Sequence, residues 1–194
     1  MPVRLIVDGG PHAGVSRADI GRRARAMLAA VEMPKAELSV VLTDDVQIAK
    51  LNGTYRKKNR PTDVLAFAQR EGEPGGLRDL LGDVVVSVET ARRQAEGRGW
   101  DLTSELTMLI AHGLLHLLGW DHTTAAEDRR MRRETDRLCA AAREAVLVRP
   151  RASSSKPTRR VARVQRVPHA TTGKGKTPAI PGHSRRRGSR DSER

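Results

Sequence analysis

Three histidines, His112, His116 and His122, lie within the short stretch Ala111–His122, which reads AHGLLHLLGWDH. His112 and His116 are four residues apart in an apolar run, so on a helix they share one face with about 6 Å of rise between them. Gly119 can end that helix, because glycine adopts the left-handed conformation without a steric penalty. The turn can then bring His122 beside the other two, and three neutral imidazoles with a fourth position open commonly hold catalytic zinc. We predict one zinc ion per chain, favoured over nickel or copper.

The residue after the first histidine distinguishes this pattern from that of a known class of zinc enzyme. The spacing H-x-x-x-H-x-x-G-x-x-H is that of the metzincin peptidases, which place a glutamate directly after the first histidine as general base. This chain has Gly113 at that position. The sequence therefore predicts the metal ligands without the peptidase base. A zinc peptidase stays an alternative that the histidine spacing supports and Gly113 opposes.

The charge of the chain is concentrated after Pro150. Residues 151–194 hold 13 Lys and Arg against Asp191 and Glu193, which accounts for +11 of the net charge of +13. This segment has no aromatic residue and no apolar period, so it cannot bury enough surface to offset the entropy lost on ordering. We predict one folded domain over residues 1–150 and a disordered basic tail over 151–194. The tail would attract nucleic acid, or act only as a solubilising extension.

The sequence indicates a cytoplasmic protein that does not enter a membrane. It has no run of 18 apolar residues, and Met1 to Val15 lacks the continuous apolar segment of a signal peptide. Cys139 is the only cysteine, which excludes an intrachain disulfide. We expect Cys139 to lie on a helix face as a small hydrophobic residue.

Apolar periodicity and helix-capping residues predict the elements that position the histidines. A strand, a helix and a second strand open the chain, an order that favours a parallel pair joined by a right-handed crossover. Thr124 and Glu127 match a capping box for the last helix. We predict strands over Val3–Asp8, Glu37–Thr43, Asp63–Ala68 and Leu81–Val88, and helices from Ser16 to about Val31, Asp44 to Leu51, Ser87 to about Gly97, Asp101 or Thr103 to Gly119, and Thr124 onward.

A basic segment follows the second predicted helix. Arg60 precedes Pro61, which disfavours a helical conformation, so we predict a loop over residues 55–62. One interpretation of the charge is a solvated loop, and the other is an anion site that faces the metal. The four cations are Arg56, Lys57, Lys58 and Arg60.

Three stretches together resemble the YbeY family, bacterial single-strand-specific endoribonucleases that act on ribosomal RNA. Residues Leu51–Phe67 are similar to the family's L-N-x-x-Y-R-x-x-x-x-P-T-D-V-L-S-F, with Ala66 where serine is usual. Residues His112–His122 are similar to H-G-x-L-H-L-x-G-y-D-H, with Trp120 in the aromatic position. The third stretch, Leu81–Ser87, lies between them in the family's order.

The resemblance covers roughly residues 3–145, so it implies nothing about the tail. It implies an α+β fold with a four-stranded mixed sheet, one strand antiparallel, about five helices and a zinc site in a positively lined cleft. It also implies zinc at the three histidines and a catalytic role for Arg56. The implied biological role is maturation of the 3′ end of 16S ribosomal RNA and ribosome quality control. The implied partners are single-stranded ribosomal RNA, the small ribosomal subunit and its assembly factors.

A zinc site of this kind is compatible with more than one mechanism of phosphodiester cleavage. Zinc with three imidazole ligands can activate water near neutral pH or polarise a phosphoryl oxygen, and Arg56 could hold the scissile phosphate by bidentate hydrogen bonds. Attack by water and attack by the RNA 2′-hydroxyl both remain possible, and no general base is assigned. Asp121 adjoins a ligand and is a candidate for the base, but we expect it instead to orient a neighbouring imidazole. A non-catalytic, ribosome-associated RNA-binding protein is the other alternative, and it would need a fourth protein ligand to close the zinc site.

The aromatic content limits how RNA could be recognised. The chain has four aromatic residues, so we expect no extended platform on which successive bases could stack. These residues are Tyr55, Phe67, Trp100 and Trp120.

Overall fold

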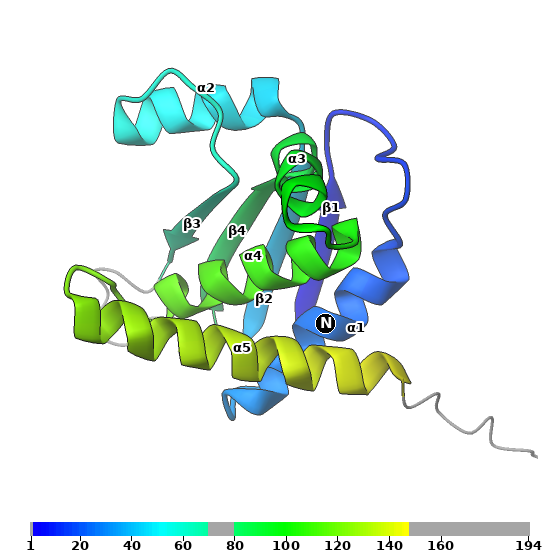
Figure 1. The fold of residues 1–194 in the computed structure, drawn as a ribbon, viewed down its shortest axis with the longest axis vertical. Helices are drawn as coiled ribbons and strands as arrows, with labels where there is room; N and C mark the ends of the chain where they lie inside the picture. The colour runs from blue at the N-terminus through cyan, green and yellow to red at the C-terminus, as the bar shows by residue number, and fades with distance from the viewer. Residues whose placement is uncertain (1, 70–79, 148–194) are drawn as a thin grey trace, which may run out of the picture. The chain divides into compact units, whose positions relative to one another are not determined.

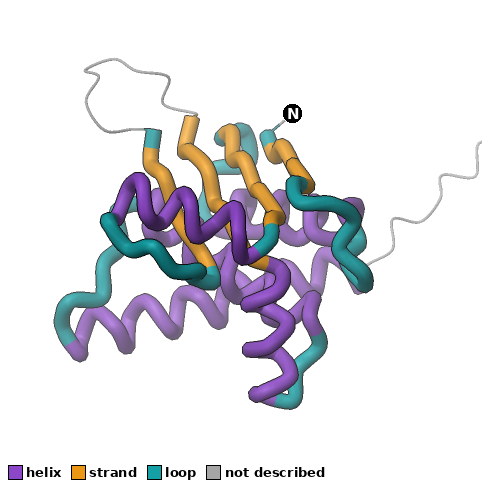
Figure 2. The backbone as a smooth tube through the Cα atoms, turned by 90° about the horizontal axis from the view of Figure 1, so that it is seen from above, coloured by secondary structure: helices purple, strands orange, loops and turns teal. Residues whose placement is uncertain are grey.

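A four-stranded mixed sheet lies at the centre of the computed structural model, which describes residues 2–69 and 80–147. The strand order is β1-β2-β4-β3, so β3 is an edge strand. β1 pairs with β2 and β2 with β4 in parallel, whereas β3 pairs with β4 in antiparallel orientation. Figure 2 shows the strands side by side, with β1 next to the marked N-terminus. The strands are β1 (Val3–Val7), β2 (Glu37–Thr43), β3 (Val64–Ala68) and β4 (Leu80–Ser87).

Helices cover both faces of this sheet. The larger core lies between one face and helices α1, α4 and α5, and α4 crosses that face with α5 packed against it (Figure 1). The smaller core lies under α2 on the opposite face. Neighbouring residues of β4 alternate between the two, because Val84 and Val86 belong to the first core and Val85 to the second. The five helices of the described residues are α1 (Arg17–Ala30), α2 (Asp45–Arg56), α3 (Val88–Arg98), α4 (Leu102–Leu117) and α5 (Ala125–Leu147).

This architecture confirms the predicted α+β fold with one antiparallel strand, and the helix starts follow the predicted caps. The side chain of Asp101 accepts a hydrogen bond from the backbone N–H of Ser104 at 2.9 Å at the start of α4. The capping box before α5 is reciprocal: the Glu127 N–H donates to Thr124 Oγ1 at 3.2 Å and the Thr124 N–H to Glu127 Oε2 at 2.8 Å. Each cap contributes about 1 kcal/mol to helix stability. The other predicted caps are Ser16, Asp44 and Ser87, and each accepts a hydrogen bond within the first turn of its helix.

Helix α2 is longer than predicted. The prediction ended this helix at Leu51 and placed a loop over residues 55–62, but the helix continues to Arg56. Pro61 restricts only the residue before it, so it does not end the helix several positions earlier. Lys57 caps the helix after Arg56: it takes the left-handed conformation with φ 60° and donates its backbone N–H to the Asn52 carbonyl.

The turn after α2 is tied back to the helix. The buried side chain of Asn52 donates from Nδ2 to the carbonyl of Arg60 at 2.8 Å. Tyr55 and Arg56 therefore stand on the last turn of a helix and not in a loop. Fewer backbone conformations are open to them, so their side chains are better fixed in direction than the prediction implied.

Three further predictions concern Cys139, membrane-spanning helices and the C-terminal tail. Cys139 is buried in α5, and burial raises the pKa of its thiol to about 11, as suits a small hydrophobic residue. Among the described residues, the helices are too short or too polar to cross a membrane. The predicted domain boundary at residue 150 and the predicted disordered tail over 151–194 lie outside the described residues, so both stay predictions.

Candidate metal site and adjoining cavity

The three histidines of the predicted metal site lie together at the C-terminal end of α4. His112 and His116 stand on successive turns, with ring centroids 4.7 Å apart and their Nε2 atoms 3.2 Å apart. The chain then turns at Gly119, where φ is +84°, and returns with His122. The ring of His122 lies 5.6 Å from that of His112 and 5.2 Å from that of His116. One ring nitrogen from each histidine can be chosen so that all three lie within 4.8 Å of one another, an arrangement that could hold a metal ion.

The donor set fits zinc. Two imidazole nitrogens bound to tetrahedral zinc, at about 2.0–2.1 Å each, are about 3.3–3.4 Å apart, close to the 3.2 Å between His112 and His116. Burial, reinforced by the charges of the neighbouring imidazoles, lowers the pKa of His112 to about 4 and lowers that of His116 as well. Both are therefore neutral at pH 7, the form that binds a metal. Within residues 2–69 and 80–147 the group has three members, which is the number of protein ligands that catalytic zinc sites commonly have.

Gly113 packs against the sheet. A Cβ atom at this position would lie 2.7 Å from Cγ1 of Val84 on β4 and 3.3 Å from Cγ2 of Val64 on β3. Glycine is therefore needed for the close approach of α4 to the two strands. A glutamate here would collide with β4, so this position cannot supply the base that metzincins use without moving the helix.

The close approach at Gly113 predicts a loss of stability in Gly113→Ala. Alanine gains about 1 kcal/mol of helix propensity over glycine, but overpacking a core costs about 1–3 kcal/mol, and the valines on two strands have little freedom to move. We expect a net loss of up to about 2 kcal/mol, measured by urea unfolding of the zinc-free protein. Gly97→Ala in α3 is the matched control, because a Cβ there meets no atom within 4 Å. Equal stability of the two variants would contradict the packing argument.

Arg56 and His116 line one cavity, although 60 residues separate them in the chain. The cavity has a volume of about 380 Å³ and lies over the edge strand β3. The end of α2 reaches it from one face of the sheet and the end of α4 from the other. The Arg56 charge is also one of the causes that lower the pKa of His116, after burial and the neighbouring His122. The residues that line the cavity are Arg56, Ala66, Phe67, Ala68, His116 and Leu117.

The other predicted cations lie outside this cavity. Lys57, Lys58 and Arg60 are exposed on the turn after α2, and the residues that line the cavity do not include them. Their predicted contact with RNA phosphates stays a prediction. The catalytic role of Arg56, which lines the cavity with His116, also stays a prediction.

Several acidic residues lie near the histidines, and two of them, Asp63 and Asp121, bear on the predictions. Asp63, which the sequence reasoning did not single out, accepts a hydrogen bond at Oδ2 from Gln94 at 3.1 Å, and its charge partly opposes the lowering of the His112 pKa. The one signal in the sequence that could have identified Asp63 is its place in the P-T-D-V stretch. Asp121 accepts a hydrogen bond from the backbone N–H of His122 at 2.7 Å, but its Oδ1 lies 4.0 Å from Nδ1 of that imidazole. That distance is too long for the orienting hydrogen bond that we expected.

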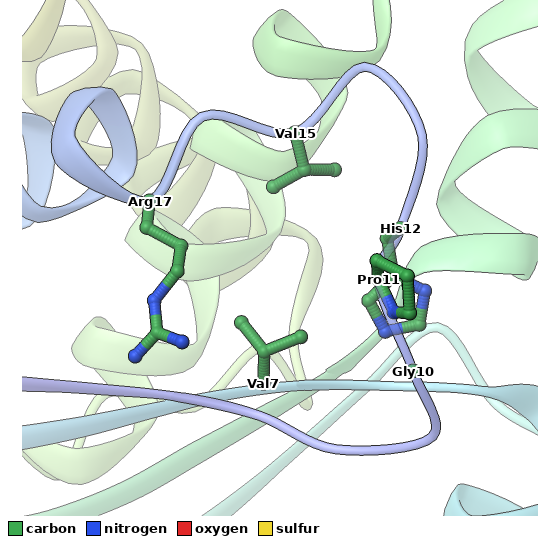
Figure 3. A pocket seen from close by; sticks show the side chains of 6 residues that line it. All are labelled: Val7, Gly10, Pro11, His12, Val15 and Arg17. Carbon is green, nitrogen blue, oxygen red and sulfur yellow. The ribbon is translucent and has the colours of Figure 1, made fainter.

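A second cavity, of about 360 Å³, lies between β1 and the loop that follows it (Figure 3). Val7 and Val15 face each other across it. Its two basic side chains contact backbone carbonyls, because Arg17 donates to Leu5 O at 3.0 Å and His12 Nε2 lies 3.1 Å from Asp8 O. The lining contains none of the three clustered histidines, so this cavity is not part of the candidate metal site.

Comparisons with known proteins show which family this chain is similar to. The sequence model of one family, described as Endoribonuclease YbeY, matches residues 14–143. A protein of that name from Aquifex aeolicus is 47% identical over 122 residues, which cover 63% of this chain and 80% of the relative. One from Syntrophotalea carbinolica is 44% identical over 119 residues, covering 60% and 79%. The solution structure of a Thermotoga maritima protein has a TM-score of 0.53 and 21% identity, and the match covers 80% of this chain and 100% of that one, which supports the fold alone.

Proposed function

The chain belongs to the YbeY family, and from that premise we propose that it is a zinc-dependent endoribonuclease specific for single-stranded RNA. The observation that carries the proposal is that Arg56 lines the same cavity as His116, which is one of the three clustered histidines. We further propose that it acts in the cytoplasm on the 3′ end of 16S ribosomal RNA, in ribosome maturation and quality control. Its partners would be the small ribosomal subunit and its assembly factors.

The side chains of the site suit phosphodiester cleavage. His112, His116 and His122 would hold zinc, which when bound supplies a Lewis acid and activates water near neutral pH. Arg56, in the cavity beside His116, would hold the scissile phosphate through its two-pronged guanidinium and stabilise the charge that develops there. The exposed cations that follow it, Lys57 among them, would contact neighbouring phosphates without reading the base sequence.

The same geometry weighs against the two rival functions. A peptidase of the metzincin type needs a glutamate where Gly113 packs against Val84. A structural zinc site needs a fourth protein ligand, and the histidine group contains three residues in the part of the chain that is described. Gly113 thus opposes the metzincin-type peptidase, and the group of three histidines favours an open metal site over a structural one.

The proposal predicts that the zinc-loaded protein cleaves single-stranded RNA and leaves duplex RNA of the same sequence and casein intact. His116→Ala, purified identically, is the necessary control, because a trace of contaminating nuclease would give the same cleavage. Products are measured by gel electrophoresis over time. Cleavage of casein by the wild type alone would identify a peptidase, and bound zinc without cleavage of any substrate would identify a binding protein.

A further inference from the structure

Tyr55 presents an exposed aromatic ring beside the cavity of the candidate site. It stands on the last turn of α2, directly before Arg56, and the residue is 65% exposed. Its ring makes a T-shaped contact with Phe67, with ring centroids 4.9 Å apart and an interplanar angle of 63°. Phe67 in turn lines the cavity together with Arg56 and His116. The Tyr55 ring is therefore separated from the cavity by one aromatic side chain.

The contact with Phe67 holds the Tyr55 ring without covering it. In a T-shaped pair the edge of one ring meets the face of the other, so Phe67 can cover at most one face of Tyr55. The helical backbone and this contact limit the rotation of the side chain, so a ligand that stacks on the ring would lose little further entropy. The ring is thus a fixed, flat apolar surface open to solvent.

The exposed ring adjoins a run of exposed cations. Arg56, Lys57, Lys58 and Arg60 follow Tyr55 in the same helix end and turn, and all are exposed. Proteins that bind single-stranded nucleic acid combine cations that contact the backbone with aromatic side chains on which bases stack. We propose that Tyr55 stacks on one unpaired base of the RNA, in a nucleotide adjacent to the phosphate that lies at Arg56. This inference rests on the proposed function, because it assigns the position of the substrate at that same site.

Stacking on Tyr55 would explain a preference for single strands. A base in a duplex is paired and stacked between its neighbours, so it can reach the Tyr55 ring only after unstacking, which costs free energy. An unpaired base meets the ring without that cost. The few aromatic residues exclude an extended platform, but a single ring is sufficient to hold one base at the cleavage position.

The inference is tested by binding measurements on the zinc-loaded full chain with a fluorescent single-stranded RNA whose 2′-O-methyl and phosphorothioate linkages resist cleavage. Tyr55→Ala should weaken binding of the single strand by about 5-fold or more, the lower range of what one base–aromatic stack contributes. Tyr55→Phe should bind within about twofold of the wild type, because the ring is kept. The dependence of affinity on salt should not change in Tyr55→Ala, since no phosphate contact is lost. Binding of duplex RNA should be equal in all three proteins.

Trp100→Ala is the matched control for loss of an exposed aromatic ring. Trp100 is 49% exposed and precedes α4, about 20 Å along that helix from His116. This variant should bind single-stranded RNA as the wild type does, and the melting temperature of Tyr55→Ala should also be unchanged.

Wild-type binding by Tyr55→Ala, or equal losses in Tyr55→Ala and Tyr55→Phe, would overturn the stacking role. These outcomes are separable from failure of the proposed function. Binding that depends on Tyr55, by a zinc-loaded protein that cleaves nothing, would refute the nuclease and keep the stacking site. Cleavage by the wild type together with normal RNA binding by Tyr55→Ala would keep the nuclease and refute the stacking site. A wild type that binds no RNA would overturn both proposals.

Discussion

Arg56→Ala should cleave single-stranded RNA about 100 to 1,000 times more slowly than the wild type. That is the typical cost of removing one preorganised group from the place where charge develops in the transition state. Zinc content and the free energy of unfolding should not change, because Arg56 is exposed and exposed charges contribute little to stability. The measurement is the single-turnover cleavage rate at saturating RNA, together with the zinc content and urea unfolding of the same preparation.

Two further variants separate the geometry of Arg56 from its charge. Arg56→Lys should recover only part of the rate, since lysine restores the positive charge without the two-pronged contact. Arg60→Ala removes an exposed cation of the same turn that does not line the cavity, so it should affect the rate at saturating RNA far less. Wild-type cleavage by Arg56→Ala would mean that Arg56 is only a solvated surface charge.

The features of the fold that depend on residues close together in the sequence could be predicted from it. Helix caps such as Ser87 and Thr124 act on the first turn that follows them, so their side chains mark where helices begin. The meeting of His112, His116 and His122 also follows from spacing, because a helical turn and one glycine suffice to bring them together. The mixed sheet with one antiparallel strand came from the resemblance to a family and not from these local signals, and the order of its strands was not predicted.

The parts that depend on distant contacts were not predictable from spacing. From the sequence, Gly113 was interpreted only as the position where metzincins have their glutamate base. In the structure, glycine is needed there because α4 packs closely against Val84 and Val64. The end of α2 was placed too early, because the contacts that extend it come from Asn52 and the Arg60 carbonyl, a pairing across a turn. That error hid the fact that Tyr55 and Arg56 are fixed side by side on a helix. No local rule places that helix end beside α4, since the two meet only around the edge strand.

His122→Ala should remove most of the zinc that the wild type holds at about one ion per chain. His122 is one of three neighbouring imidazoles and the only one supplied from outside α4, so its loss leaves two ligands on a single helix. A metal that binds only the folded state stabilises it in proportion to the logarithm of its concentration over Kd, about 2.7 kcal/mol at 100 times Kd. Added zinc should therefore raise the melting temperature of the wild type by several degrees and that of His122→Ala far less.

His12→Ala is the matched control for this experiment. His12 lies in the loop after β1, contacts a backbone carbonyl and is not a member of the histidine group, so its replacement should leave zinc content and the zinc-induced rise in melting temperature unchanged. Zinc is measured by mass spectrometry of the dialysed protein, and melting is followed by circular dichroism with and without added zinc. Because removing one of three imidazoles leaves too few protein donors for tight binding, full zinc occupancy in His122→Ala would refute the three-ligand site. Loss of zinc in both variants would instead point to a general effect of histidine content.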